Sequence, residues 1–394
     1  MNSYIKSFKG NGRLARYYPI FFSLEPNKEI LVQEALDYCQ EIGHIGGFAK
    51  IREIMSAEPN VMIKEPQWRA EALSKAFHEE KEFAERLTKL HTTEEKSKIL
   101  IEQSDRHEFY GEYQKGIKCC IDALVDLKNK ELIADVCYRL IRMNIFCDNF
   151  NQASTYLETL KTTMVYSGTK YKRFVQFIDF LFALRHPDTF ATAFYLLETV
   201  TTLEDKEEWE FNEFLSFEDI AIYGMICGLL TQNHKMNVER LINNPKFRNH
   251  ADTIPELVEL MNNYKNNKFA LISDNVKQLE KYFKLNIYFG QNLQSCIHTI
   301  KNQCYIEYIF AYSVVDMKLM SKMFGESLDE IERVLEEYIY NDIIKAKIDA
   351  VTHTLHFVEG DERYNAYVTA LRAVKKAINL SQEIVLKADA MFDF

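Results

Sequence analysis

The segment from Gln303 to Phe357 constrains the fold more than any other part of this 394-residue chain, because the spacing of its apolar residues changes within it. Apolar residues first recur every three or four positions, as on one face of a helix, and then every second position, as on one face of a strand. Ser313 and Ser327 each stand three positions before an acid, which is the spacing of a capping box at a helix start. The order predicts three helices followed by two short strands.

Each capping box predicts where one of the three helices begins. The box at Ser313 predicts a helix with Val314, Met317, Met320 and Phe324 on one face, and the box at Ser327 predicts one with Leu328, Ile331, Leu335 and Ile339. Alternation then places Ile344, Ala346, Ile348, Leu355 and Phe357 on one face of a β-hairpin. Three helices closed by a hairpin form the order of a winged helix.

The charge of the third helix argues against the nucleic-acid binding that winged helices often perform. It carries Asp329, Glu330, Glu332, Glu336 and Glu337 against the single base Arg333. A helix that reads the major groove must neutralise phosphates and presents Arg or Lys there. We therefore expect protein–protein assembly, with nucleic-acid binding as the less favoured alternative.

Composition places the chain among helical proteins of a reducing compartment. The net charge is -10, and only 13 Gly and 7 Pro occur, too few for a loop-rich fold. None of the eight cysteines forms a C-x-x-C pair, so we expect reduced thiols in the cytoplasm and nucleus. The sequence lacks the pattern of a secretory signal, and its longest apolar run, Ile220–Leu230, is too short to span a bilayer. No membrane partner is expected.

A faint repeat runs through the middle of the chain. An aromatic residue followed three positions later by a small one occurs at Tyr113, Phe150 and Phe190, at intervals of 37 and 40 residues. A bulky ring beside a small residue lets two antiparallel helices close tightly at their turn. The period predicts a right-handed, tetratricopeptide-like stack of helical hairpins, although hairpins without common ancestry remain the alternative.

The expected organisation has four parts. Residues 1–214 form the helical-repeat region, 215–302 the helical part of a second domain, 303–358 its winged helix, and 359–394 a long terminal helix. A capping box at Ser216 opens the second part and leads into a fully apolar helix over 220–230.

The terminal helix carries one long apolar stripe. Its members recur every three or four positions: Tyr364, Tyr367, Val368, Leu371, Val374, Ile378, Ile384, Val385, Ala388 and Met391. A helix this long with one apolar face is typical of a bundle or coiled coil. Packing against its own domain is the alternative.

No residue set with catalytic or ligand-binding spacing is present. The run Gly10–Ala15 fits G-x-G-x-x-A, but no apolar strand precedes it, and the fingerprint requires one. The ten histidines are scattered, and no pair has metal-ligand spacing with an acid. We therefore predict no catalytic residue, no cofactor and no metal.

Helical repeats that run without a linker into a winged helix and end in a long helix resemble the PCI-domain family. Three stretches carry the resemblance: Tyr4–Phe21, Ile220–Leu230, and Ile300–Tyr308 with Tyr312, Asp316, Met317 and Met320 after it. They are most similar to the signalosome branch of the family. The paralogous proteasome-lid branch is the alternative, favoured by Phe217–Asp219.

The resemblance implies a scaffold, since this family builds the proteasome lid, the COP-9 signalosome and a translation initiation factor. It implies partners that carry PCI or MPN domains, and an indirect role in removing a ubiquitin-like modifier from cullin-RING ligases, with the chemistry in another subunit. We assign the subunit interface to the hairpin and the terminal helix, at Ile344, Ala346, Ile348, Leu355, Phe357, Leu371, Val374, Ile378, Ile384 and Val385.

Overall fold

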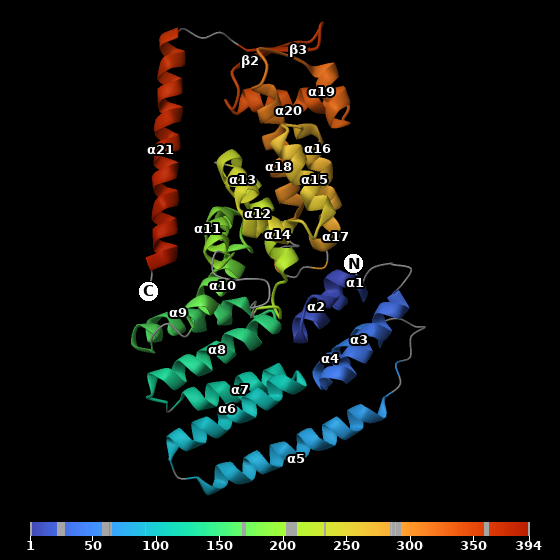
Figure 1. The fold of residues 1–394 in the computed structure, drawn as a ribbon, viewed down its shortest axis with the longest axis vertical. Helices are drawn as coiled ribbons and strands as arrows, with labels where there is room; N and C mark the ends of the chain where they lie inside the picture. Colours follow the sequence, from blue (N-terminus) through green and yellow to red (C-terminus); the bar gives the residue numbers. More distant parts are fainter. Residues whose placement is uncertain are drawn as a thin grey trace.

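The structure is a computed structural model. It describes residues 2–21, 28–56, 63, 65–90, 92–125, 127–167, 171–201, 211–231, 234–283, 285, 288, 293–357 and 362–392. Helices dominate, and they run from an N-terminal layer through stacked hairpins to a winged helix at the far end (Figure 1). The predicted helical repeat followed by a winged helix is confirmed. Among the described residues no helix is long and apolar enough to cross a membrane.

The N-terminal half consists of a short helical layer and three helical hairpins. The layer comprises α1 (Asn2–Lys6), α2 (Gly10–Phe21), α3 (Lys28–Ile42), α4 (Ile45–Ser56) and α5 (Gln67–Lys89). The hairpins pair α6 (Thr93–Tyr110) with α7 (Tyr113–Leu124), α8 (Lys130–Phe146) with α9 (Phe150–Ser167), and α10 (Lys172–Ala183) with α11 (Phe190–Thr201), the last pair joined through η1 (Pro187–Thr189).

The aromatic residues of the repeat mark the same point in each hairpin. Tyr113, Phe150 and Phe190 are the first residues of α7, α9 and α11. The small residue three positions later is buried in each case, and a Cβ at Gly116 would lie 2.7 Å from the sulfur of Met143 in the next hairpin. The small side chain therefore permits close packing between neighbouring hairpins.

The second part begins as the capping box predicts. Ser216 accepts a hydrogen bond from the Asp219 N–H while Asp219 accepts one from the Ser216 N–H, and α12 (Phe217–Leu230) is buried on every side from Ile220 to Leu229. Six further helices follow: α13 (His234–Asn243), α14 (Pro245–Ala251), α15 (Pro255–Lys265), α16 (Phe269–Gln278), α17 (Glu280–Phe283) and α18 (Leu293–Ile309).

The winged helix contains one more strand than predicted. Its elements are β1 (Val314–Asp316), α19 (Met317–Phe324), α20 (Leu328–Tyr340), β2 (Ala346–Asp349) and β3 (Thr354–Phe357), with strand order β1-β3-β2. The box at Ser327 is confirmed at the start of α20. The box at Ser313 is wrong: Val314 pairs with His356 in the sheet, and Asp316 caps α19 by accepting from the Lys318 and Leu319 N–H groups.

A fully buried ion pair joins the N-terminal helices to the start of α12. The Arg16 side chain is 0% exposed and that of Asp219 is 1% exposed, with 3.5 Å between Nη2 and Oδ2. Arg16 also donates to the Phe214 carbonyl at 2.9 Å, and Tyr4 donates its hydroxyl hydrogen to Asp219. Burial raises the pKa of the Asp219 carboxyl, and the charge of Arg16 opposes that shift. We call Tyr4, Arg16 and Asp219 the buried polar cluster.

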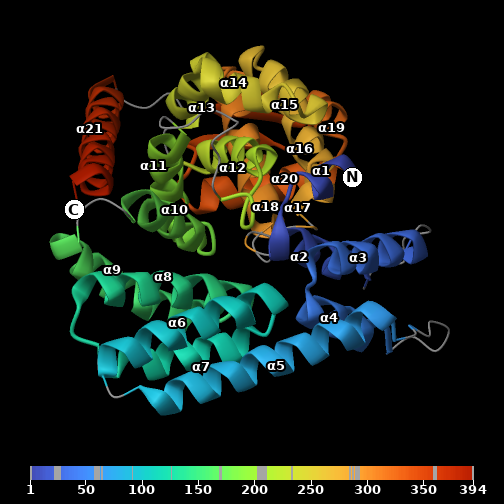
Figure 2. The same cartoon turned by 60° about the horizontal axis from the view of Figure 1, so that its bottom comes forward.

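The glycines of the apparent dinucleotide fingerprint have a packing role. A Cβ at Gly12 would lie 1.8 Å from the Glu213 carbonyl oxygen, so only glycine lets α2 approach the chain before α12 this closely. The Lys9 N–H also donates to the Asn212 carbonyl at 3.3 Å. Figure 2 shows α1 and α2 between α3 and α4 on one side and the helices of the second part on the other.

We predict that Arg16→Met lowers the free energy of unfolding by about 3–5 kcal/mol, because it leaves the Asp219 carboxylate buried without its cation. Adding Asp219→Asn is expected to restore part of this loss, since no unpaired charge then remains. Urea unfolding of the full chain measures both effects.

Arg13→Met is the matched control one turn earlier. The Arg13 guanidinium lies 4.1 Å from the centre of the Tyr38 ring, and its side chain is only half-buried, so we expect a loss of about 1 kcal/mol. Equal losses at positions 13 and 16 would contradict the special role of the buried pair.

Candidate functional site

The strand order β1-β3-β2 makes β1 and β2 the edge strands of the winged-helix sheet, and β2 is the edge that belongs to the predicted hairpin. The Phe357 N–H donates to the Ser313 carbonyl and the Met317 N–H to the His353 carbonyl, so odd-numbered residues of β3 direct their backbone groups toward β1. The register then pairs Lys347 with His356 through hydrogen bonds. The backbone N–H and C=O groups of Ala346 and Ile348 consequently point away from the sheet.

The side chains of the hairpin residues assigned to the interface face inward instead. Ile344, Ala346 and Leu355 are buried in the winged-helix core, and Ile348 and Phe357 are partly buried against it. Their side chains therefore stabilise this domain. Only the backbone of β2 is placed to meet a partner, through the groups of Ala346 and Ile348.

The terminal helix α21 (Glu362–Phe392) folds back along the molecule and contacts α11 (Figure 1). The half-buried residues on its described part are Asn379, Leu380, Glu383, Lys387 and Ala388, so a largely polar face meets the body of the protein. Burial raises the pKa of Tyr195 on α11, and the nearby carboxylate of Glu383 on α21 adds to this rise. In the free chain α21 thus packs on α11 of the helical-repeat region through this face.

The apolar stripe of α21 points to solvent. At 100° per residue, Leu371, Val374, Ile378 and Val385 lie within about 60° of one another around the helix. Their exposed fractions are 48%, 55%, 51% and 56%, and Ile384 beside them is 67% exposed. Val374, Ile378 and Val385 also line a groove of about 660 Å³. The side chains of Tyr364, Tyr367, Val368 and Met391 lie outside the described residues.

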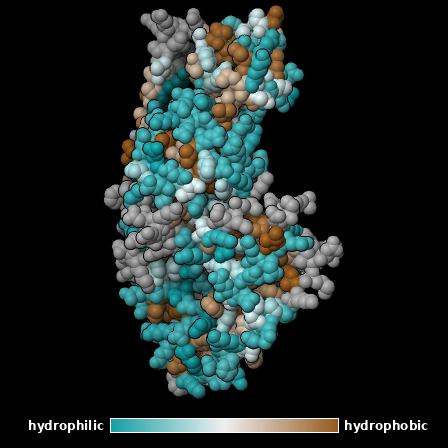
Figure 3. Space-filling model, turned by 45° about the vertical axis from the view of Figure 1, so that its right-hand side comes forward, coloured by the Kyte–Doolittle hydropathy of each residue, from teal (hydrophilic) through white to brown (hydrophobic). Residues whose placement is uncertain are grey.

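A second apolar surface covers the winged helix, and the sequence analysis did not assign it. Figure 3 shows brown side chains gathered at the upper end of the molecule. The exposed apolar residues of this region include Phe310, Val314, Leu319, Met323 and Val351. Leu319 and Met323 stand four positions apart on α19, so their shared face was readable from the sequence.

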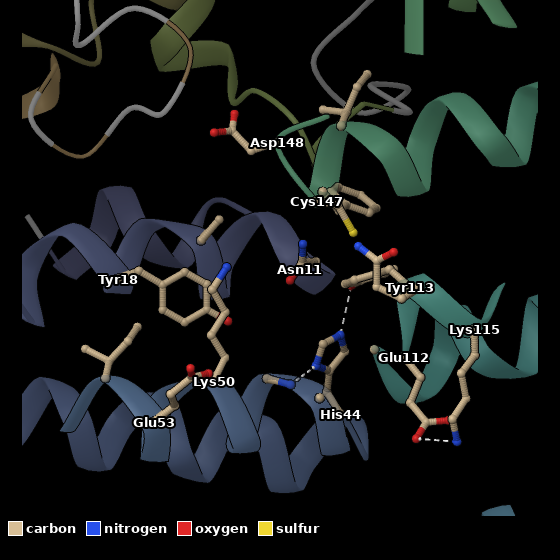
Figure 4. A pocket seen from close by; sticks show the side chains of 18 of the residues that line it. Asn11, Tyr18, His44, Lys50, Glu53, Glu112, Tyr113, Lys115, Cys147 and Asp148 are labelled. Atoms are coloured by element: carbon tan, nitrogen blue, oxygen red, sulfur yellow. Dashed lines mark hydrogen bonds and ion pairs between the residues drawn. The ribbon is translucent and has the colours of Figure 1, made fainter. Parts of the chain in front are cut away.

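A cavity of about 940 Å³ lies between α2, α4, the start of α7 and the turn from α8 to α9 (Figure 4). His44 and Tyr113 meet at one end of it, with 2.9 Å between Nε2 and the hydroxyl oxygen. The Gly47 N–H donates to Nδ1 of the same ring at 2.8 Å. Nδ1 is therefore the acceptor and Nε2 carries the proton. The sequence analysis read Tyr113 only as a repeat residue and did not find this contact.

No group of three or more potential metal ligands occurs in the described ranges. Each of the eight cysteines is free, and burial raises the pKa of the thiols of Cys39 and Cys304 to about 12. Such thiols stay protonated and are poor nucleophiles or metal ligands at neutral pH.

Two protein-family models match this architecture. The model described as 26S proteasome subunit RPN7 matches residues 65–236, and the model of the PCI domain matches residues 268–359. The second match spans the winged helix and the helices that precede it. Residues 268–359 are thus identified as a PCI domain.

Curated relatives fall into both expected branches. COP9 signalosome complex subunit 1 of Arabidopsis thaliana is 26% identical over 162 residues, which is 41% of this chain and 37% of the relative. Subunit 1b of Drosophila melanogaster is 20% identical over 286 residues, 72% of this chain and 54% of the relative. The 26S proteasome non-ATPase regulatory subunit 6 of Dictyostelium discoideum is 21% identical over 251 residues, 64% of each.

The matched part thus spans about a third to a half of these signalosome relatives. The relatives in both branches are named as subunits of larger assemblies, the COP9 signalosome complex and the 26S proteasome.

We predict that His44 makes stability depend on pH. Burial lowers its pKa from 6.5 to about 4, so the folded state favours the neutral ring. The stabilisation that the neutral His44 ring contributes is present above pH 6.5 and is lost as the pH falls toward 4. The free energy of unfolding therefore falls by about 2 kcal/mol between pH 7 and pH 5. His44→Gln lacks this titrating group. Urea unfolding should show a pH dependence smaller by that amount in the variant, and identical dependence in both proteins would contradict the assignment.

Proposed function

We propose that this chain is a non-catalytic scaffold subunit of a signalosome-type complex in the cytoplasm and nucleus. The observation that carries the proposal is the orientation of α21, whose polar face meets α11 while its apolar stripe faces solvent. A stripe of this size left in water is a feature of interaction sites. Helices of neighbouring subunits are its expected partners, because a single apolar stripe is buried by other amphipathic helices in a bundle.

The free edge of β2 supplies a second contact in this proposal. Two outward N–H and two outward C=O groups, on Ala346 and Ile348, can extend the sheet into the winged helix of another PCI subunit. Edge pairing fixes the register between two subunits, whereas the helix stripe contributes most of the buried apolar area. The partners are then other PCI-domain subunits, together with MPN-domain subunits.

Similarity to the signalosome relatives supports the choice of complex. In this role the chain would support deneddylation of cullin-RING ligases carried out by a different subunit, and it would itself bind no cofactor. The proteasome regulatory lid is the alternative, favoured by the match of residues 65–236 and by the Dictyostelium relative.

Purification of the tagged chain from its native cells, followed by mass spectrometry of the co-purifying proteins, separates the two complexes. Signalosome subunits in stoichiometric amounts are the expected result. Lid subunits in their place would support the alternative, and a chain recovered without PCI-domain partners would overturn the scaffold proposal.

We predict that Leu371→Asp with Ile378→Asp abolishes incorporation into the complex while the isolated chain unfolds at nearly the same temperature. Both side chains are about half exposed in the free chain, and burial of each against a partner is worth roughly 1.5–3 kcal/mol. Co-purification and thermal unfolding measure the two effects.

Ala370→Asp with Ala373→Asp is the matched control, since both residues are exposed and lie off the stripe. It introduces the same charge and should leave incorporation intact. A large loss of monomer stability in the stripe variant alone would mean that the stripe packs within its own chain.

We also predict that Ile348→Pro weakens assembly about tenfold, because it removes one outward strand donor worth roughly 1 kcal/mol and disfavours pairing at the edge. The hairpin bonds of Lys347 and Asp349 remain, so helical content should not change. Ile348→Ala is the control for lost side-chain packing, since it keeps the N–H. Equal affinity of the Pro and Ala variants for the partner subunits would exclude the edge as an interface.

A further inference from the structure

The cavity between α2, α4, α7 and the turn from α8 to α9 is separate from both proposed assembly surfaces (Figure 4). Its volume of about 940 Å³ falls in the range of 300–1,000 Å³ that is typical of ligand sites. Its walls combine apolar and aromatic side chains, Ala15, Tyr18, Ile54 and Phe146, with a few polar groups. This composition is that of a binding pocket rather than a solvent-filled crevice.

Tyr113 holds a hydrogen-bond donor that its neighbours do not use. The Nε2–H of His44 donates to the Tyr113 oxygen, so the hydroxyl hydrogen must point elsewhere. Among the described residues no acceptor contacts it. Burial raises the pKa of Tyr113 well above its usual value, so the hydroxyl stays protonated and remains a donor. Satisfying such a group is worth roughly 1 kcal/mol in a complex.

The charges of the pocket disfavour a strongly anionic ligand. Lys50 and Lys115 face three carboxylates, those of Glu53, Glu112 and Asp148. Lys115 is paired with Glu112 at 3.1 Å, and the Lys50 ammonium lies 4.6 Å from the centre of the Tyr18 ring. An excess of acids would repel phosphate groups. The ligand that matches this pocket is largely apolar and carries a neutral hydrogen-bond acceptor.

We propose that this pocket binds an extended peptide segment of a partner protein, which places an apolar side chain against Tyr18 and Phe146 and accepts the Tyr113 hydrogen with a main-chain carbonyl. A peptide supplies both features, since each residue carries a neutral carbonyl next to a side chain. The amides of Asn11 and Gln114 also line the pocket and can pair with further backbone groups.

The test uses the full chain and a random dodecapeptide library displayed on phage. Selected peptides are synthesised with acetylated and amidated ends, and their affinity is measured by fluorescence anisotropy. Ala15→Trp fills the pocket and is expected to weaken binding at least tenfold. Tyr113→Phe keeps the ring and removes the donor, and the loss of one hydrogen bond of about 1 kcal/mol predicts about fivefold weaker binding.

Ala49→Trp is the matched control, because Ala49 is exposed on α4 and does not line the pocket. It should bind the peptides like the wild type. If Ala15→Trp unfolds, Ile54→Trp replaces it as the filling variant. All variants are first compared with the wild type by thermal unfolding.

Two results would overturn the proposal. One is a library that yields no binder, or only binders that the filling variant retains. The other is displacement of the peptide by millimolar inorganic phosphate, which would make the cavity an anion site. Neither result bears on the scaffold proposal, since α21 and the edge of β2 are unchanged in these variants.

Discussion

The buried ion pair between Arg16 and Asp219 ties together parts of the chain that are about 200 residues apart. A charge at 0% or 1% exposure is tolerated only when its partner is in place, and the cost of a missing partner is several kcal/mol. Arg16, Tyr4, the Phe214 carbonyl and the capping box at Ser216 must therefore assemble together. The N-terminal helices, whose own apolar core also includes Leu285, are thereby joined to the start of the second domain.

The same helix, α2, connects this core with the pocket. Arg16 points into the buried polar cluster, while Ala15 and Tyr18 line the pocket on another side of the helix. Gly12 fixes the distance between α2 and residue 213. Because Arg16 anchors α2 on the side away from the pocket, α2 cannot move without breaking the ion pair. The α2 wall of the pocket is therefore held in place by the fold, which lowers the entropy cost of binding a peptide there.

Local signals in the sequence predicted much of this fold, and contacts between distant residues account for what they missed. The boxes at Ser216 and Ser327 were correct because a cap depends only on residues within one helical turn. The box at Ser313 failed because Val314 pairs with His356, which no local pattern reveals. The apolar stripe of α21 was predicted from the spacing of its residues, but that spacing does not show that the stripe faces solvent. Arg16, His44 and the unused donor of Tyr113 have no periodic signal at all.

The way α21 docks also bears on how a subunit of this kind would assemble. Its contact with α11 uses a half-buried, largely polar face, and exposed polar or ionic contacts are worth about 0–1 kcal/mol each. Each stripe residue buried against a partner contributes roughly 1.5–3 kcal/mol. The burial of two or three such residues is worth more free energy than several polar contacts. A partner bundle can therefore bind α21 whether the helix stays on α11 or leaves it. The free chain therefore keeps the helix ordered without using the surface that a partner needs.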